Sequence, residues 1–433
     1  MKTNRRTFIQ GLGTGVVGAW ASGSLVAAAP APAPAPAMGS SWPIFDAAQP
    51  AAFWRAVRAS YPLLEDPLYL NTGGLGPVAQ PVLDQMIATM YKLQQHSETG
   101  YDLFEPARVT VAQFIGAQSR EISFVRNATE GNCIIAAGLA LTAGDEVIFE
   151  SHAHPGGSFP WYNQAKLRGI TVRLFEPDPT SPEANLARIR ALITPRTKVI
   201  QVSHVTCTTG LVLPVAAIAR LAQSQGIWFH VDGAQAVGMI PVNLNALGCD
   251  SYAFSGHKWL GGPHETGVFY IRRDRLAEVA PTSMGAHGAE LPFLPGELKY
   301  FDGTRRHEYG TRNAGLITGL AEAVRGQTLM GPERIAAHGR ELATLLQTEL
   351  ARIDGITVLT PRADDMRAAM TSIRHARAGA HKLFTYLLDE HRLRCRPVTE
   401  QGLEVVRIST HIFNSPADCE RVINGVRAAA RAL

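Results

Sequence analysis

The sequence is poor in cysteine and in aromatic side chains. Its 433 residues are 7% aromatic and contain five cysteines, an odd number with no C-x-x-C spacing. We therefore expect neither a disulfide framework nor a structural zinc site, and we expect the thiols to be buried and inert. The cysteines are Cys133, Cys207, Cys249, Cys395 and Cys419.

Charge is also scarce, because only 18% of the residues are charged and the net charge is +4. Lys2, Arg5 and Arg6 supply three of these charges, which leaves about +1 for the rest of the chain. This balance gives no basis for binding to nucleic acid or to an anionic membrane surface. No run of residues beyond the N-terminal segment is long and apolar enough to span a bilayer.

A glycine motif near the start of the chain has the spacing of a dinucleotide-binding loop, Gly13-x-Gly15-x-x-Gly18. Such a loop needs a buried strand before it and an acidic residue about 20 positions after it. The preceding residues, Lys2–Thr7, are polar, and the first acidic residue is Asp46. The motif therefore fails both requirements, and we do not expect a nucleotide there.

The arginine pair beside these glycines indicates export. The stretch NRRTFI, residues 4–9, resembles the twin-arginine signal and precedes a weakly apolar, small-residue segment. We expect a signal peptide at 1–28, an Ala/Pro-rich linker at 29–45, recognition by the twin-arginine translocation machinery, and a periplasmic protein without a stable membrane anchor. An ordinary secretory signal is the alternative.

From Asp46 onward, short apolar runs alternate with helical patterns, for example at 130–141 and 215–225. This βαβ alternation predicts an α/β fold with a large, mostly parallel seven-stranded sheet in a domain at 46–325. The pattern changes to a smaller α+β domain at 326–433, with helices at 332–352, 380–390 and 416–432 and short strands near residues 357, 371 and 405. The seven predicted strands are 122–126, 146–149, 171–175, 198–202, 227–231, 251–254 and 267–271.

Three chemical groups follow strands of this predicted sheet directly. Asp232 follows one strand, Lys258 follows another, and Asn127-Ala128-Thr129-Glu130 opens a helix after a third. In an open α/β sheet, ligands bind outside the carboxyl ends of the strands. A lysine for a Schiff base, an acid beside a pyridine nitrogen and a helix N-terminus for a phosphate together suit pyridoxal 5′-phosphate (PLP).

Four stretches, NATEG, FHVDGAQAVG, FSGHKWLGG and EYGTRN, occur in an order that resembles the class V aminotransferase superfamily of fold-type I PLP enzymes. That superfamily includes cysteine desulfurases, isopenicillin N epimerases and serine-type transaminases. The resemblance implies that Lys258 is catalytic and that an EYGTRN loop reaches a second subunit of a homodimer. It implies cofactor-binding roles for Thr129, Glu130, His154, Asp232, Gln235, Ser255, His257 and Thr311, and substrate-binding roles for Arg407 and Asn71.

The resemblance also shows where this chain departs from the desulfurases. Those enzymes carry a nucleophilic cysteine on the loop before the carboxylate-binding arginine, whereas the loop between Pro397 and Val406 has none. Cys395 lies on the strand side and is interpreted as structural. Cys207 occupies a position where many relatives have an asparagine. The pair His152 and His154 lacks a third metal ligand nearby, so we expect no metal and a structural or solvated His152.

These features predict a PLP-dependent aminotransferase that acts on an amino acid or on a peptide-borne amino group. The alternative is an epimerase of the isopenicillin N epimerase type. A desulfurase or lyase, or a PLP-binding protein without turnover, is less favoured, because the lysine, the acid and the arginine are all present.

Overall fold

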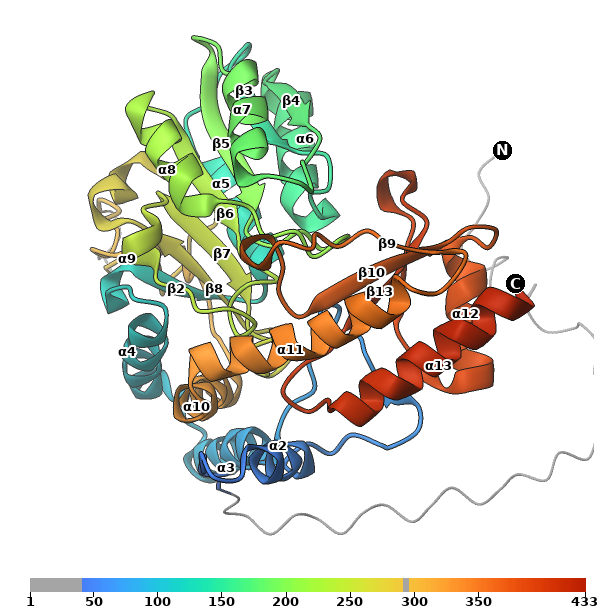
Figure 1. Ribbon diagram of the computed structural model, residues 1–433. Coiled ribbons are helices and arrows are strands. Elements are labelled where there is room, and N and C mark those ends of the chain that lie inside the picture. The colour runs from blue at the N-terminus through green and yellow to red at the C-terminus, as the bar shows by residue number, and fades with distance from the viewer. Residues whose placement is uncertain (1–40, 291–295) are drawn as a thin grey trace, which may run out of the picture. The chain divides into compact units, whose positions relative to one another are not determined.

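The central sheet has seven strands in the order β2-β8-β7-β6-β5-β3-β4. It is seen in a computed structural model that describes residues 41–290 and 296–433 (Figure 1). All neighbouring strands run parallel except β8, which is antiparallel to both β2 and β7. The seven predicted strands are confirmed within one or two residues at each end. Their bounds are β2 Ile122–Val125, β3 Glu146–Glu150, β4 Thr171–Phe175, β5 Thr197–Ser203, β6 Trp228–Asp232, β7 Ser251–Ser255 and β8 Gly267–Ile271.

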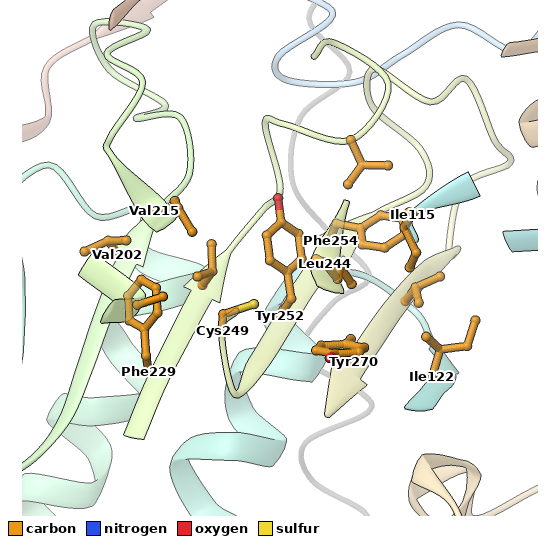
Figure 2. Close-up of a cluster of buried hydrophobic side chains, with 14 of the residues drawn as sticks. Ile115, Ile122, Val202, Val215, Phe229, Leu244, Cys249, Tyr252, Phe254 and Tyr270 are labelled. Carbon is orange, nitrogen blue, oxygen red and sulfur yellow. The ribbon is translucent and has the colours of Figure 1, made fainter. Parts of the chain in front are cut away.

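Apolar side chains cover both faces of the sheet. Successive residues of a strand contribute to opposite faces. Along β3, for example, Ile148 packs into one hydrophobic cluster, while its neighbours Val147 and Phe149 pack into another. Successive residues of a strand point to opposite faces, so an almost wholly apolar strand is typical of a sheet buried on both sides. The first cluster includes Phe229, Tyr252, Phe254 and Tyr270 and continues to Ile122 on β2 (Figure 2).

Helices connect these strands and line the sheet. They include α5 Ala128–Gly138, α6 Pro155–Arg168, α7 Pro182–Leu192, α8 Val215–Ser224 and the one-turn α9 Leu244–Leu247. Before the sheet come α2 Pro50–Ala59, β1 Leu68–Tyr69, α3 Gln80–His96 and α4 Phe104–Phe114, and after it comes α10 Ala314–Met330. Helix α10 packs against both α3 and α4.

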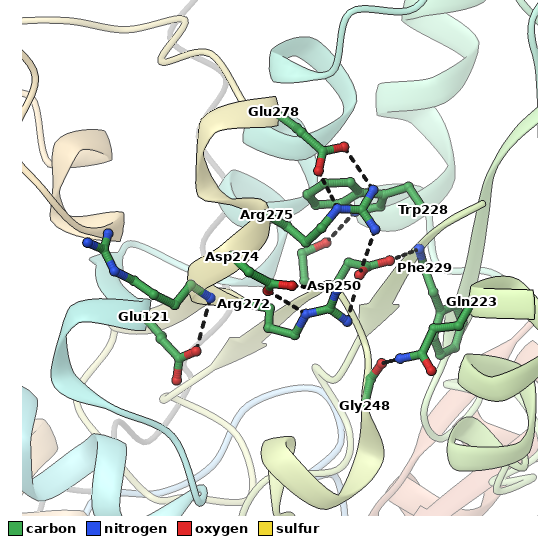
Figure 3. Close-up of polar contacts among 12 residues, drawn as sticks. Glu121, Gln223, Trp228, Phe229, Gly248, Asp250, Arg272, Asp274, Arg275 and Glu278 are labelled. Atoms are coloured by element: carbon green, nitrogen blue, oxygen red, sulfur yellow. Dashed lines mark hydrogen bonds and ion pairs between the residues drawn. The ribbon is translucent and has the colours of Figure 1, made fainter. Parts of the chain in front are cut away.

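A buried ion cluster fastens β6 to β7 at the edge opposite their carboxyl ends (Figure 3). Asp250, which directly precedes β7, accepts a 2.8 Å hydrogen bond from the amide of Phe229. Its other oxygen pairs with Arg272 at 3.0 Å and with Arg275 at 3.2 Å. Because the guanidinium of Arg275 also lies over the ring of Trp228, these contacts hold the start of both strands together.

A second sheet of four antiparallel strands has the order β12-β13-β10-β9, with bounds β12 Arg396–Val398, β13 Val405–Ser409, β10 Met370–His375 and β9 Ile356–Val358. Helices α11 Pro332–Leu350, α12 Ala380–His391 and α13 Pro416–Ala432 lie against it (Figure 1). Their leucines and valines share one hydrophobic cluster with Ile373, Val406 and Ile408. The three predicted helices of this region are confirmed, with end shifts of up to two residues.

Strand β12 is not among the short strands predicted near residues 357, 371 and 405, although the sequence places Cys395 on the strand side of the following loop. It is three residues long, contains Pro397 and lies at the edge of its sheet. Proline cannot donate a ladder hydrogen bond, so it is confined to edge strands and weakens any strand prediction. A second short element, β11 Leu393–Arg394, pairs in parallel with β1.

All five cysteines are free thiols, and four of them are buried, as predicted. Cys133 on α5 is exposed, so the expectation of burial was wrong for this residue. It was wrong because the run NCIIAAG is apolar almost throughout, and only the packing of the helix decides which side faces out. Cys395 packs in the second hydrophobic cluster, where burial raises its thiol pKa to about 12. This agrees with a structural role.

The predicted export signal and most of the predicted linker lie outside the described residues. Within residues 41–290 and 296–433, no helix has both the length and the apolarity needed to cross a membrane. The boundary predicted between a large domain ending at residue 325 and a smaller one starting at 326 stays a prediction.

Candidate active site

The carboxyl ends of β2, β6 and β7 meet strand β13 around a cavity of about 300 Å³. This volume is at the lower end of the range typical of small-molecule pockets. Eight of the eleven predicted site residues line it: Thr129, His154, Asp232, Gln235, Ser255, His257, Lys258 and Arg407. Asn71, Glu130 and Thr311 lie elsewhere and are described below.

Lys258 lies three residues beyond the end of β7. Burial, opposed by the attraction of Asp232, lowers the pKa of its ammonium group from 10.5 to about 8. About a tenth of the amine is therefore neutral, and so nucleophilic, at pH 7, far more than for a free lysine. The N-terminal loop packs directly on this lysine's backbone, because the amide of Gly76 donates to the carbonyl of His257 at 2.7 Å. A Cβ on Gly76 would lie 1.9 Å from the Lys258 carbonyl oxygen, so only glycine fits.

Asp232 ends β6 with its side chain buried, and two donors hold its carboxylate. The amide of Ala234 donates to Oδ1 and the side-chain amide of Asn132 donates to Oδ2, each at 3.0 Å. Hydrogen bonds of this kind stabilise the ionised form of a carboxylate. They also fix its direction, and Asp232 lines the cavity.

Behind Asp232 lies a chain of buried hydrogen bonds that sequence reasoning missed. Asn132 Oδ1 lies 2.8 Å from His230 Nε2, and His230 Nδ1 lies 2.8 Å from the hydroxyl of Ser251. The Trp228 indole donates to the same hydroxyl at 2.9 Å. His230 and Asp232 are two residues apart on β6 and share a face, so one asparagine on α5 reaches both.

The donor and acceptor directions of this chain follow from its chemistry. An amide oxygen can only accept, so Nε2 of His230 carries the proton. Burial lowers the pKa of His230 to about 3, so the ring is neutral and Nδ1 must accept from Ser251. The chain therefore runs in one direction, from Trp228 through Ser251, His230 and Asn132 to Asp232.

His154 is the N-cap of α6 and lines the cavity. Its Nδ1 accepts from the amide of Gly156 at 3.0 Å, which places the proton of the neutral ring on Nε2. Burial first, and the charge of Lys258 second, lower its pKa and keep the ring neutral. His152 is buried instead against the hydroxyl of Thr208 at 3.2 Å and the carboxylate of Glu176 at 3.2 Å, as expected for a structural histidine.

The N-terminus of α5 forms another wall of the cavity. The hydroxyl of Ser255 accepts from the amide of Ala128 at 3.1 Å, and Asn127 caps the amide of Glu130 at 3.0 Å. Here the structure differs from the cofactor-binding role that the resemblance implies for Glu130, because its amide already donates to the N-cap side chain. The amide of Thr129 has no hydrogen-bond partner outside its own helix among the described residues, so it can donate into the cavity.

Arg407 is wholly buried on β13. It donates to the carbonyl of Cys207 at 2.6 Å and to Asn71 Oδ1 at 3.1 Å, and its Nε has no partner among the described residues. Burial first, and the nearby Arg396 second, lower its pKa to about 10. Asn71 therefore orients the arginine rather than lining the cavity itself.

The two remaining predicted residues, Glu130 and Thr311, line a neighbouring cavity of about 260 Å³ with Arg126 and Tyr309. Glu130 forms an ion pair with Arg126, and Thr311 is exposed. Conversely, Arg396 lines the main cavity and was not predicted. It lies on the missed strand β12, so the pattern that hid the strand also hid the arginine.

Comparison with known protein families shows to which family this chain belongs. The model of the family described as "Aminotransferase class-V" matches residues 78–422. The chain belongs to the class-V aminotransferase family. This class-V protein is 32% identical to a "Probable cysteine desulfurase" of Vibrio cholerae over 87% of this chain and 98% of the relative. It is also 28% identical to an "Isopenicillin N epimerase" of Streptomyces clavuligerus over the same shares.

Solved structures agree with this assignment. A cysteine desulfurase from Thermococcus onnurineus superposes with a TM-score of 0.79 at 27% identity, covering 87% of this chain and 98% of the other. A mutant of C-DES with glycine covalently linked to its PLP cofactor superposes with a TM-score of 0.78 at 25% identity, covering 86% and 98%. The predicted fold-type I architecture is confirmed. The family is PLP-dependent, so the predicted cofactor is confirmed as well.

The residues of this class-V protein fit PLP. Three cations, Lys258, Arg396 and Arg407, line the cavity with one carboxylate, Asp232, an excess that suits anionic ligands. At the α5 side, the buried Nδ1 of His257 has no partner within the described residues. It lies in the same wall as the free Thr129 amide, as a phosphate site requires. Within residues 41–290 and 296–433, no group of three or more His, Cys, Asp or Glu side chains is arranged to hold a metal.

Proposed function

We propose that this protein is a PLP-dependent aminotransferase that moves the amino group of an α-amino acid, free or carried by a peptide, to a 2-oxo acid. The observation that carries the proposal is that Lys258, Asp232 and Arg407 line one cavity. Lys258 can attach the cofactor, Asp232 can support its ring nitrogen, and Arg407 can recognise an α-carboxylate. The individual roles below belong to this proposal.

The bound cofactor supplies an electron sink that makes the Cα–H bond of an amino acid acidic. Lys258 would hold the cofactor through its amine and would take the proton from Cα of the substrate. Asp232, aimed by Asn132, supports the positive ring nitrogen. The neutral imidazole of His154 would stack on the cofactor ring, and Gln235, whose side-chain oxygen accepts from Trp259 at 2.7 Å, would contact the ring hydroxyl.

Arg407 binds the α-carboxylate. It has no carboxylate partner within the described residues and two donors fixed by Cys207 and Asn71, so the guanidinium is preoriented for a bidentate contact. The Thr129 amide, Ser255 and His257 would hold the cofactor phosphate at the wall formed by α5 and the end of β7. These two anchors set the position of Cα beside Lys258.

The pKa of Lys258 favours amino transfer over epimerisation, because it makes this residue the best-placed proton carrier of the cavity. Epimerisation needs a second acid on the opposite side of Cα, able to exchange a proton near neutral pH. Burial raises the pKa of the Cys207 thiol and lowers that of His257 to about 4, so neither suits that task. Lys258, with its pKa of about 8, is well placed to move the proton.

A desulfurase reaction by persulfide transfer is disfavoured by the cysteines. Such a reaction needs a reactive thiolate that can approach the substrate sulfur. Cys207 is the cysteine that lines the cavity, but it is buried and its thiol pKa is raised. Cys395, close to the arginines in sequence, is locked in the second hydrophobic cluster.

We further propose that the enzyme is a periplasmic homodimer exported in the folded state. A protein that encloses its cofactor must fold before or during loading, and the twin-arginine route carries folded proteins. The exposed Thr311 loop, beside the cavity that Glu130 and Arg126 line, is the surface through which a second subunit completes the phosphate site.

The decisive experiment supplies single L-amino acids to purified holoenzyme without an acceptor. We expect one 2-oxo acid to appear per active site, together with a change in the visible absorbance of the lysine-bound cofactor that a 2-oxo acid reverses. Lys258→Ala should abolish both signals. Lys198→Ala, which changes an exposed lysine on β5, is the matched control and should leave both intact.

Other products of the same experiment would identify a different activity. Accumulation of the D-amino acid with its nitrogen retained identifies an epimerase. Formation of alanine from cysteine, with sulfide released only when a thiol reductant is supplied to reduce the transferred sulfur, identifies a desulfurase. If no amino donor yields a 2-oxo acid and the cofactor spectrum never changes, aminotransferase activity is refuted.

A further inference from the structure

Two arginines stand side by side at the active-site cavity, although one suffices to bind an α-carboxylate. Arg396 on β12 is directly opposite Arg407 on β13 in the antiparallel ladder. Side chains in such a pair point to the same face of the sheet, with Cβ atoms about 5 Å apart. Both line the cavity.

This arrangement is unfavourable for folding alone. Like charges directly opposite one another destabilise a sheet. The cost is visible at Arg407, whose pKa is lowered to about 10 first by burial and then by the charge of Arg396. A core residue could occupy position 396 at lower cost, so the second charge indicates a ligand.

Arg396 already has a partner that can be exchanged. It forms an ion pair with Glu400, four residues ahead in a one-turn helix, Glu400–Gly402. Both side chains are about a quarter exposed, at 27% and 26%. Because both side chains reach solvent, the pair is not locked in the interior, and a substrate anion can replace the glutamate as the partner of Arg396. Glu400 itself does not line the cavity.

Arg396 is also close to the reacting centre. Its charge, together with that of Arg407, lowers the pKa of Lys258, and it acts on His154 as well. The proposed phosphate wall is formed by α5 and the end of β7, whereas Arg396 and Arg407 come from the second sheet. The phosphate therefore leaves Arg396 free.

We propose that Arg396 binds a second acidic group of the amino donor, so that the substrates are α-amino acids with a side-chain carboxylate, free or within a peptide. Arg407 holds the α-carboxylate, Arg396 holds the distal carboxylate, and Glu400 is the resting partner that the distal carboxylate displaces. Donors with a neutral side chain leave the Arg396–Glu400 pair in place. This assignment rests on the proposed aminotransferase function but can be tested without turnover.

The first test measures binding of unreactive acids to the holoenzyme. Glutarate and pentanoate have chains of equal length but carry two carboxylates and one. Glutarate should bind about 10- to 100-fold more tightly, which is the value of one charge-assisted hydrogen-bonded contact. Arg396→Gln should remove that preference, and Arg396→Lys should restore part of it if the glutamine variant is poorly folded. Arg394→Gln changes an exposed arginine in the same segment and should keep the preference.

The second test compares kcat/KM for glutamate with kcat/KM for norvaline, its neutral counterpart. In Arg396→Gln the ratio should fall about 10- to 100-fold. Glu400→Gln should raise the affinity for glutarate, because the competing carboxylate is gone.

Equal binding of glutarate and pentanoate to the wild-type protein, or a preference that survives Arg396→Gln, overturns the proposal. Failure of the aminotransferase proposal can be distinguished from failure of the Arg396 proposal. If only the aminotransferase proposal fails, glutarate is still preferred in an Arg396-dependent way, but glutamate yields no 2-oxo acid. The opposite failure is turnover of norvaline with no preference for a second carboxylate.

Discussion

Replacing Asn132 by leucine removes the side chain that joins His230 to Asp232. Asn132 is fully buried and makes three hydrogen bonds, to the carbonyl of Gly156, to the Asp232 carboxylate and to His230. Asn185 offers a matched control. It is equally buried and also makes three hydrogen bonds, all to the backbone of residues 178 and 181, far in sequence from the site.

The expected losses of stability differ by one charged contact. Three neutral hydrogen bonds at about 0.5–1.5 kcal/mol each predict that Asn185→Leu lowers the free energy of unfolding by about 2–4 kcal/mol. In Asn132→Leu one of the three bonds is to a carboxylate and is worth about 1.5–3 kcal/mol, so the loss is about 3–6 kcal/mol. Urea unfolding of the two apo proteins measures both values.

Cofactor affinity separates positioning from stability. Without Asn132, Oδ2 of Asp232 loses its donor and the carboxylate is free to turn from the cavity. We expect the dissociation constant of PLP to rise about 10-fold, which corresponds to 1.4 kcal/mol and is the lower bound of the lost contact. Asn185→Leu should leave it unchanged. The absorbance of the bound cofactor reports both titrations.

Equal PLP affinities in the two asparagine variants would refute the reasoning. That result would mean that the buried chain from Trp228 to Asp232 only stabilises the fold. A large loss of affinity in Asn185→Leu would instead mean that global destabilisation, not the direction of Asp232, controls cofactor retention.

Three further predictions concern Glu150, Gly76 and the arginine pair near the N-terminus. Burial raises the pKa of Glu150 to about 7 from 4.5. The folded state therefore holds this proton more tightly than the unfolded state, so stability falls by about 3 kcal/mol as pH rises from 4.5 to 7. Urea unfolding across this range should show that the free energy of unfolding depends less on pH in Glu150→Gln than in the wild type. Identical pH dependences in the two proteins would contradict the prediction. Gly76→Ala should cost about 1–3 kcal/mol and weaken PLP binding, because its Cβ meets the Lys258 carbonyl. Normal binding of PLP by that variant would show that the loop yields freely. Replacing Arg5 and Arg6 by lysines should leave active holoenzyme in the cytoplasm on cell fractionation, and unimpaired export would rule out the twin-arginine route.

Much of the fold could be predicted from local patterns. The strands of the central sheet are short apolar runs flanked by turn residues, and their alternation with helical patterns identifies them as strands. Strand β12 has neither property. Its three residues include Pro397, and only pairing with β13 makes them a strand. The second arginine of the cavity was missed for the same reason.

The site residues also divide into those that local patterns predict and those that only packing reveals. Lys258 and Asp232 each end or follow a strand, and the carboxyl ends of parallel strands meet at one edge, so their convergence could be inferred. Asn132 could not be recognised as functional. It is a single amide in an apolar helix, and its value depends on the distances to His230 and Asp232 that packing of α5 on the sheet creates.

The sequence by itself determined the family, the cofactor and the order of the chemical groups along the chain, because these depend on residue types at fixed local spacings. Only the tertiary structure decided which groups are occupied and which are free. Asn71 orients Arg407, and a cross-strand register sets Arg396 beside Arg407. Such contacts join residues up to 336 positions apart, and a local pattern carries no information about distances of that kind.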